Sequence, residues 1–177
     1  RRVPIFGRRM YDRADSLARA SKALGRGRRK QAIAEYRRVL EQEPTNPVIL
    51  GKLAPLLAET RQLAEAGAMW SAAGKQYENQ GFSEKALAVY TQAVAYLPRS
   101  VELWETISGL YLARSRRADA VSALLEGRKH FRRRKQRPLA IRLLRGAVRI
   151  EPWQLDATLD LARLLTKSGA RPEADRL

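Results

Sequence analysis

The chain has 177 residues, 45% of them hydrophobic, and a formal net charge of +17 at pH 7. This hydrophobic share excludes a disordered tail, because enough apolar surface can be buried to offset chain entropy. The absence of cysteine excludes disulfides, thiolate metal sites and a cysteine nucleophile. No apolar stretch approaches the roughly 20 residues that cross a bilayer, so we expect a cytoplasmic protein. Because the sequence begins at Arg1 and not Met, the question whether it is part of a longer protein stays open.

The sequence predicts helices throughout. Ala, Leu, Arg, Glu, Lys and Gln dominate it, and these residues lose little on entering a helix. No run of alternating β-branched and polar residues is long enough for a strand. The fold class predicted is therefore all-α, with a basic lead-in over residues 1–12 and a single helical array over residues 13–177.

In chain order, the first two helices carry small and aromatic residues at Ser16, Ala20, Ala23, Ala32 and Tyr36 and end before Pro44. Apolar residues at three- and four-residue steps then predict further helices, and Pro44, Pro98 and Pro152 are expected to terminate helices. Asn46 and Ser100 are expected to cap the helices that follow them. Pro47 and Pro138 suit first turns. The predicted ranges are 47–60, 63–80, 83–97, 101–114, 117–133, 138–151 and 155–168, after which only 171–177 remain for a partner helix.

One residue pattern repeats along these helices. Residues 67–98 read W-x2-A-G-x2-Y, then A-x3-Y, then P, beginning at Trp70. The same frame starts at residues 16, 50, 70, 104, 124 and 158, so successive starts differ by 34, 20, 34, 20 and 34. The complete unit is thus 34 + 20 = 54 residues with three helices, and the helices around Trp70 and Leu124 each belong to two overlapping motifs. An ordinary helical bundle is the alternative.

The pattern resembles the tetratricopeptide repeat, or TPR, family almost position for position, in a 54-residue three-helix variant. Gly-Phe-x-x-Lys-Ala at 81–86 resembles bacterial arrays of this family. The resemblance implies a right-handed α-solenoid of antiparallel helix pairs with a concave and a convex face. It also implies that first-helix residues facing the concave groove bind peptide, which by position are Ser71, Lys75, Glu78, Asn79, Glu102 and Glu105. The Lys/Asn/Arg carboxylate clamp of chaperone-binding members is not reproduced.

Positive charge gathers in two clusters. Residues 1–38 hold 13 Lys or Arg against 3 acidic residues, and residues 114–150 hold 13 against 2. Such clusters predict salt-sensitive binding of a polyanion, either nucleic acid or anionic lipid, although a solvated basic surface is the plainer interpretation. Phe131 is the only Phe, Tyr or Trp inside the second cluster, which disfavours base stacking. The candidate anion-binding residues are Arg26, Arg28, Arg29 and Lys30, and Arg128, Lys129, Arg132, Arg133, Arg134, Lys135 and Arg137.

Catalysis finds little support. His130 is the single histidine, and no Ser or Asp lies at a spacing from it that indicates a catalytic partner. Asp156 and Asp160 share a helix face but are expected to be solvated. We expect no enzyme activity, cofactor, metal or small-molecule substrate.

Two functions stay open: a scaffold that binds a protein partner, within a larger assembly, and a polyanion-binding repeat protein. The last repeat, from residue 155, is incomplete and is expected to expose an apolar face. Continuation in a longer protein, a docked partner or self-association would cover that face.

Overall fold

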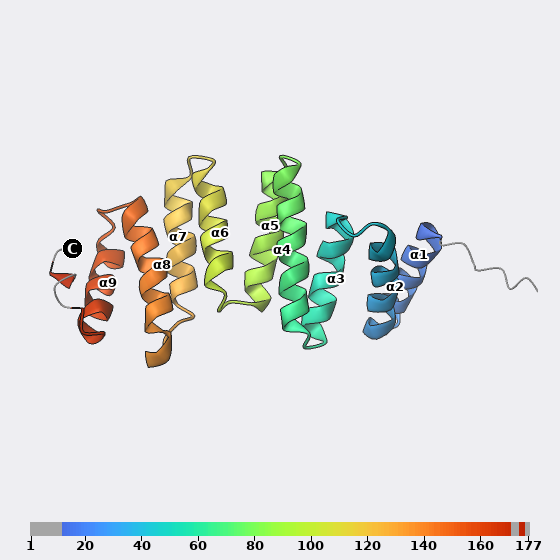
Figure 1. Cartoon of the computed structure of the whole chain (residues 1–177), viewed down its shortest axis with the longest axis horizontal. Helices are drawn as coiled ribbons and strands as arrows, with labels where there is room; N and C mark the ends of the chain where they lie inside the picture. Colours follow the sequence, from blue (N-terminus) through green and yellow to red (C-terminus); the bar gives the residue numbers. More distant parts are fainter. Residues whose placement is uncertain (1–11, 171–173, 176–177) are drawn as a thin grey trace, which may run out of the picture. The chain divides into compact units, whose positions relative to one another are not determined.

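The computed structural model describes residues 12–170 and 174–175, and these residues form nine α-helices and one short 3₁₀-helix. The chain divides into two compact units, residues 1–76 and 77–177, and the division falls within α4. In each unit, neighbouring helices run antiparallel and side by side (Figure 1). The helices are α1 (Arg13–Gly25), α2 (Arg29–Gln42), α3 (Pro47–Glu59), α4 (Leu63–Asn79), α5 (Ser83–Tyr96), α6 (Val101–Leu112), α7 (Arg117–Arg128), η1 (Arg134–Gln136), α8 (Arg137–Ile150) and α9 (Leu155–Lys167).

The all-α prediction is confirmed, and most helix boundaries follow from local chemistry. The Asn46 side chain accepts the backbone N–H groups of Val48 and Ile49 at 3.0 and 3.2 Å, beside Pro47 in the first turn of α3. Ser100 caps α6 in the same way. These caps satisfy donors that have no partner inside the helix. The predicted lead-in lies outside the described residues except for Asp12, which caps α1.

One predicted helix is wrong in length. The range 117–133 ends at Arg128, after which the amides of Lys129, His130 and Phe131 bond to carbonyls only three residues back. Gly127 weakens the last turn, and the Lys and Arg residues after it would stand four apart as like charges on a longer helix. Phe131 is still buried, but it reaches the core from the loop. The helix around Leu124 is therefore shared between two hairpins without being long.

Turns between helices repeat with the spacing of the motif. A left-handed backbone conformation occurs at Gly27, Arg61, Gly81, Ser115 and Gly169. These positions differ by 34, 20, 34 and 54 residues, and 54 is again 34 + 20. Glycine adopts a positive φ without steric cost, whereas Arg61 at 66° and Ser115 at 58° do so against the clash of a Cβ atom. At these five turns the same backbone shape therefore recurs even where the residue does not prefer it.

Small residues let the helices approach closely. Ala20, Ala32, Ala66, Ala86 and Ala120 are all completely buried. The tightest contact lies between α6 and α7, where a Cβ atom built on Gly127 would lie 2.5 Å from Cγ of Trp104. The Trp104 ring is held in place because its Nε1–H donates to the carbonyl of Pro98 at 2.9 Å. It also stacks on His130, with ring centroids 5.9 Å apart.

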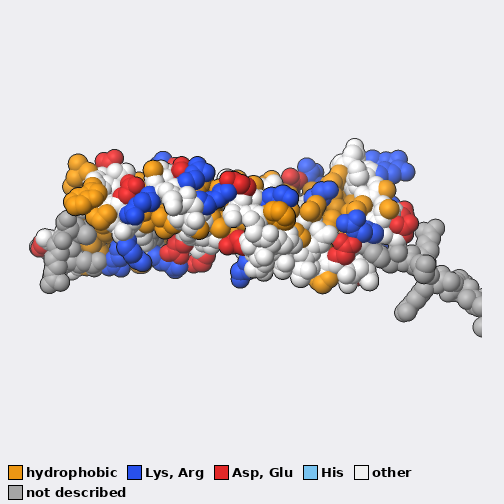
Figure 2. Space-filling model, turned by 90° about the horizontal axis from the view of Figure 1, so that it is seen from above, with side chains coloured by type: hydrophobic (Ala, Val, Ile, Leu, Met, Phe, Trp, Pro, Cys, Tyr) orange, Lys and Arg blue, Asp and Glu red, His pale blue; other side chains and the backbone are white. Residues whose placement is uncertain are grey.

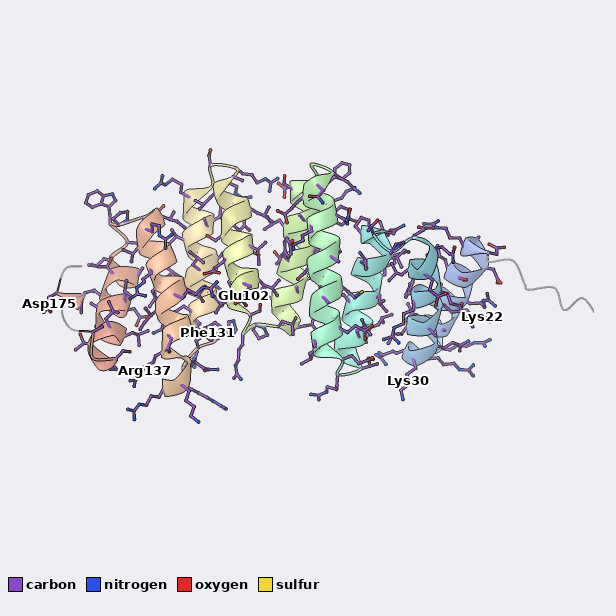
Figure 3. All side chains as sticks on the ribbon, viewed as in Figure 1. Lys22, Lys30, Glu102, Phe131, Arg137 and Asp175 are labelled. Atoms are coloured by element: carbon purple, nitrogen blue, oxygen red, sulfur yellow. The ribbon has the colours of Figure 1, made fainter. Side chains whose placement is uncertain are left out.

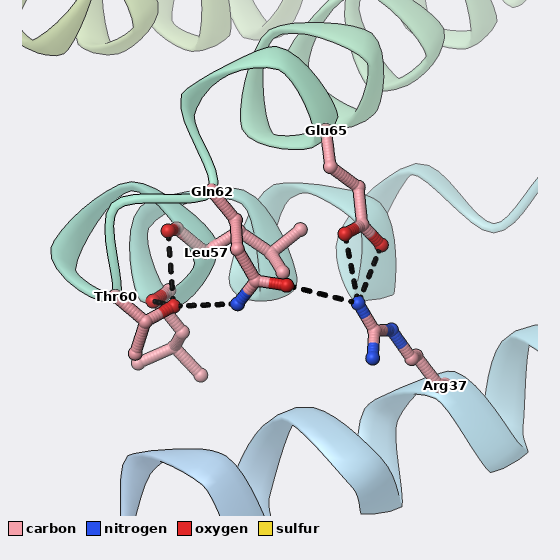
Figure 4. A network of polar contacts seen from close by, with 6 residues as sticks. Arg37, Leu57, Thr60, Gln62 and Glu65 are labelled. Carbon is pink, nitrogen blue, oxygen red and sulfur yellow. Dashed lines mark hydrogen bonds and ion pairs between the residues drawn. The ribbon is translucent and has the colours of Figure 1, made fainter.

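Arginines in or beside one helix pair with carboxylates 28–37 residues away along the chain. In the first unit, Arg37 of α2 donates to both oxygens of Glu65 on α4 at 2.7 and 2.8 Å, and also to Gln62 (Figure 4). In the second unit, Arg128 of α7 pairs with Asp160 of α9 at 2.5 Å. The other such pairs are Arg13 with Glu43, Arg29 with Glu59, Arg114 with Glu84, and Arg142 with Glu105. Six arginines therefore link one helix, or the turn beside it, to another.

Candidate functional site

The predicted groove residues on α4 differ in solvent exposure and in whether their side chains bond to other residues. Ser71 is half-buried, whereas Lys75, Glu78 and Asn79 are more open to solvent. Glu78 accepts a hydrogen bond of 2.8 Å from the hydroxyl of Tyr90, and burial together with this bond raises the pKa of Tyr90. Lys75 and Asn79 make no side-chain hydrogen bond or ion pair with another described residue. They are four residues apart, so they share one face of the helix.

The two predicted groove residues on α6, Glu102 and Glu105, both contact an arginine of α8. Arg142 of α8 donates from Nε to Oε1 of Glu105 at 2.7 Å and from Nη2 to Oε2 at 2.5 Å. Its Nη1 also lies 3.6 Å from Glu102. Hydrogen bonding to Glu105 raises the pKa of Arg142. Sequence reasoning missed Arg142, because its separation of 37 residues from Glu105 matches neither the 34- nor the 20-residue step.

The second basic cluster divides into paired and unpaired residues. Arg128 pairs with Asp160 and Lys129 with Glu126, while Arg132 and Arg137 donate to backbone carbonyls. The paired set therefore has less freedom to meet an anion than its charge suggests. The residues that remain exposed, with no side-chain hydrogen bond or ion pair to a described residue, are Arg133, Arg134 and Lys135 at η1.

The first basic cluster lies beside a surface pocket. Arg29 pairs with Glu59 at 2.5 Å, but Arg26, Arg28 and Lys30 are exposed and their side chains bond to no described residue. The pocket has a volume of about 230 Å³. It is lined by Arg19, Lys22, Ala23, Arg26, Arg28 and Gln31. Four cationic side chains from a single hairpin thus converge on one small space, and two of them, Arg19 and Lys22, were not among the predicted residues.

Apolar side chains are exposed on the last hairpin of the second unit, in the incomplete repeat. Trp153 is 91% exposed, Leu155 65% and Leu159 45%. Figure 2 shows hydrophobic side chains gathered at the end of the unit that carries α9. The first two residues occupy the places of Arg99 and Val101 one 54-residue unit earlier, and Val101 there is only 1% exposed. The predicted partner helix falls on residues 171–177, most of which lie outside the described residues.

No group of three or more metal-ligating side chains occurs among the described residues. His130 is half-buried against the Trp104 ring. Asp160 is engaged by Arg128, and Asp156 is exposed. Within the described part of the chain, no helix is both long and apolar enough to cross a membrane.

Comparison with known proteins identifies one family. Residues 23–82, from the end of α1 to the turn after α4, match the tetratricopeptide repeat family. No curated protein sequence matches the chain.

Similar solved structures include residues 41 to the end of MamA from Desulfovibrio magneticus RS-1, with 16% identity over 94% of this chain and 92% of that one, at a TM-score of 0.34. A tetratricopeptide repeat protein from Parabacteroides merdae has 15% identity over 93% and 76%, at a TM-score of 0.34. A thermophilic TPR protein from Thermus thermophilus has 17% identity over 88% and 100%, at a TM-score of 0.32. At these TM-scores the likenesses do not bear on function. The match over residues 23–82, together with the same residue pattern in the hairpins that follow, supports a tetratricopeptide repeat protein.

Proposed function

We propose that the chain is a non-enzymatic scaffold that binds a peptide or a partner subunit within a larger assembly. The observation that carries this proposal is the face of α4 on which Lys75 and Asn79 stand unengaged. An ammonium and a side-chain amide can together donate to and accept from the backbone or acidic side chains of a bound segment. Helical repeats hold such side chains on a rigid backbone, which limits the entropy lost on binding.

Affinity capture followed by mass spectrometry tests the proposal. The double variant Lys75→Glu, Asn79→Ala should lose the partner that the wild-type chain captures. Lys52→Glu is the matched control, because Lys52 on α3 is exposed and unpaired like Lys75 but lies outside the predicted groove positions. Retention of the partner by the double variant, or equal loss in both variants, would refute the groove assignment.

Polyanion binding is the second candidate function. The observation in its favour is the exposed, unpaired run Arg133, Arg134 and Lys135. Neutralising phosphates with these side chains would make affinity for a mixed-sequence oligonucleotide fall steeply with salt. Replacing all three with Glu should then abolish binding. Absence of binding at modest salt would remove this candidate.

Self-association through α9 also stays a prediction, and light scattering of the chain with and without Leu155→Arg decides it.

A further inference from the structure

The pocket between α1 and α2 contains an arginine, Arg28, that lacks the carboxylate found at the equivalent place of another hairpin. Because 26 + 88 = 114 and 28 + 88 = 116, where 88 is 34 + 20 + 34, Arg26 and Arg28 correspond to Arg114 and Arg116. Arg114 pairs with Glu84, and Arg116 donates to Asp119 at 2.7 Å. Asp119 corresponds in turn to position 31, which is Gln31 in this hairpin.

The arginine that Asp119 neutralises in the second unit therefore has no such carboxylate beside it in the first. Hydrogen bonding to Asp119 raises the pKa of Arg116, as expected for a satisfied ion pair. Gln31 offers an amide where Asp119 offers a charge. The side chains of Arg26 and Arg28 bond to no described residue, so the positive charge that these two arginines bring to the pocket has no counterion among the described residues.

Arg19 is fixed at the wall of this pocket by carboxylates that stand outside it. Its Nη2 lies 2.9 Å from Asp15, and its Nε lies 3.6 Å from Glu35 on α2, whose side chain is 8% exposed. The latter distance is too long for a hydrogen bond, and the Arg19 Nε is buried without an acceptor. Arg19 is therefore held at the wall of the pocket, where it adds to the positive charge.

The start of α2 adds to the positive potential. Its N-cap residue, Arg28, makes no side-chain cap bond, and its first turn contains no acidic residue. The first turns of α4 and α7 hold Glu65 and Asp119 at the place of Gln31. Acidic side chains there offset the partial positive charge of a helix N-terminus, and at α2 this charge is not offset from within the first turn.

We propose that this pocket binds the phosphoryl group of a phosphorylated serine or threonine on a partner protein. The inference rests on the scaffold function proposed above and specifies the chemistry of the partner. A volume of about 230 Å³ on one hairpin suits a single compact dianion, not a nucleic-acid backbone that runs across several helices. Guanidinium groups match phosphate oxygens with paired hydrogen bonds, and clusters of arginine are a recurrent means of recognising phosphopeptides.

Isothermal titration of the chain with a short phosphoserine peptide, its unphosphorylated form and inorganic phosphate tests the proposal. Binding of the phosphopeptide and weaker competition by inorganic phosphate are expected, with no binding of the unphosphorylated peptide. Arg26→Gln with Arg28→Gln should weaken phosphopeptide binding at least tenfold. Because these side chains have no internal partner, the variant should fold with an unchanged helical spectrum.

Lys30→Gln is the matched control for charge. Figure 3 shows Lys22 on α1 and Lys30 at the start of α2, and only Lys22 lines the pocket. Lys30→Gln removes one of the neighbouring positive charges and should change affinity less than twofold. A loss per charge equal to that of the arginine variant would overturn the pocket in favour of a diffuse basic surface.

The sources of the phosphate are separated by two further arms. Inorganic phosphate that binds as tightly as the phosphopeptide would overturn a peptide ligand, and an oligonucleotide that binds more tightly than either would overturn the choice of a compact dianion. Affinity capture distinguishes failure of this proposal from failure of the scaffold function. If a partner that depends on Lys75 is captured but phosphatase treatment does not release it from the wild-type chain, only the phosphate inference fails.

Discussion

Replacing Gly127 with alanine should destabilise the second unit. The added Cβ atom would lie 2.5, 2.7 and 2.8 Å from three atoms of the Trp104 ring, well inside the ordinary contact distance of about 3.5–4.0 Å. The ring is 8% exposed and cannot move away without disturbing its hydrogen bond to Pro98 and its stacking on His130. Overpacking of this kind costs about 1–3 kcal/mol.

Helix propensity works against this cost, because alanine gains about 0.5–1 kcal/mol over glycine in a helix. Overlap with three ring atoms should exceed that gain, giving a net loss of about 1–2 kcal/mol and a fall in Tm of about 2–8 °C. Gly109→Ala on α6 is the control, since nothing lies within 4 Å of the added Cβ atom, and it should be stabilising or neutral.

Thermal and guanidinium unfolding followed by circular dichroism measures both variants. A chain with Gly127→Ala that is as stable as the wild type would refute the steric argument. A double-mutant cycle adds a sharper readout: with Trp104→Leu in place, Gly127→Ala should cost much less than in the wild-type background.

Three further predictions concern single side chains. Ser115→Gly should stabilise the chain by about 0.5–1 kcal/mol in guanidinium unfolding by relieving a positive φ, whereas Ser115→Ala should not. Asp160→Asn should cost about 1–2 kcal/mol by leaving a largely buried arginine without its counterion, and Asp156→Asn on the same helix should change stability by less than about 0.5 kcal/mol. Hydrogen bonding from Arg114 lowers the pKa of Glu84 in the folded chain, so this pair stabilises above the unfolded pKa and the contribution is lost as pH falls through the folded pKa. Between about pH 5 and pH 3 the wild-type Tm should therefore fall more than that of Glu84→Gln, and parallel curves would contradict the assignment.

The repeat pattern predicted where helices lie and which residues are buried, because both depend on local periodicity. Trp70, Ala86 and Tyr90 are all in the core, as their places in the motif require. The length of α7 escaped prediction, since motif spacing places Phe131 in the core without saying whether a helix or a loop brings it there. Packing sets the position of that side chain, and the charged residues after Gly127 end the helix earlier.

Pairing between side chains was less accessible from sequence. Arg142 and Arg128 pair with carboxylates two helices away, and which carboxylate an arginine meets depends on side-chain rotamers and helix packing. The local density of charge placed Arg26, Arg28 and Arg29 in one cluster. It did not show that Arg29 pairs with Glu59 while Arg26 and Arg28 have no partner among the described residues. Comparison with the equivalent hairpin does provide that signal, because the lost carboxylate at Gln31 is visible in the printed sequence.

The arginine bridges also bear on how the chain folds. The longest of these pairs, Arg142 with Glu105, joins residues only 37 apart, and the others join residues 28–32 apart. Proteins dominated by such short sequence separations fold in microseconds to milliseconds, since little loop entropy is lost before each contact forms. A nascent chain can therefore complete each bridge once the next hairpin has emerged from the ribosome, without waiting for the C-terminal residues. Conversely, unfolding that begins at one end need break only the bridges of one hairpin at a time, as in a molecule whose stability is set by nearest neighbours.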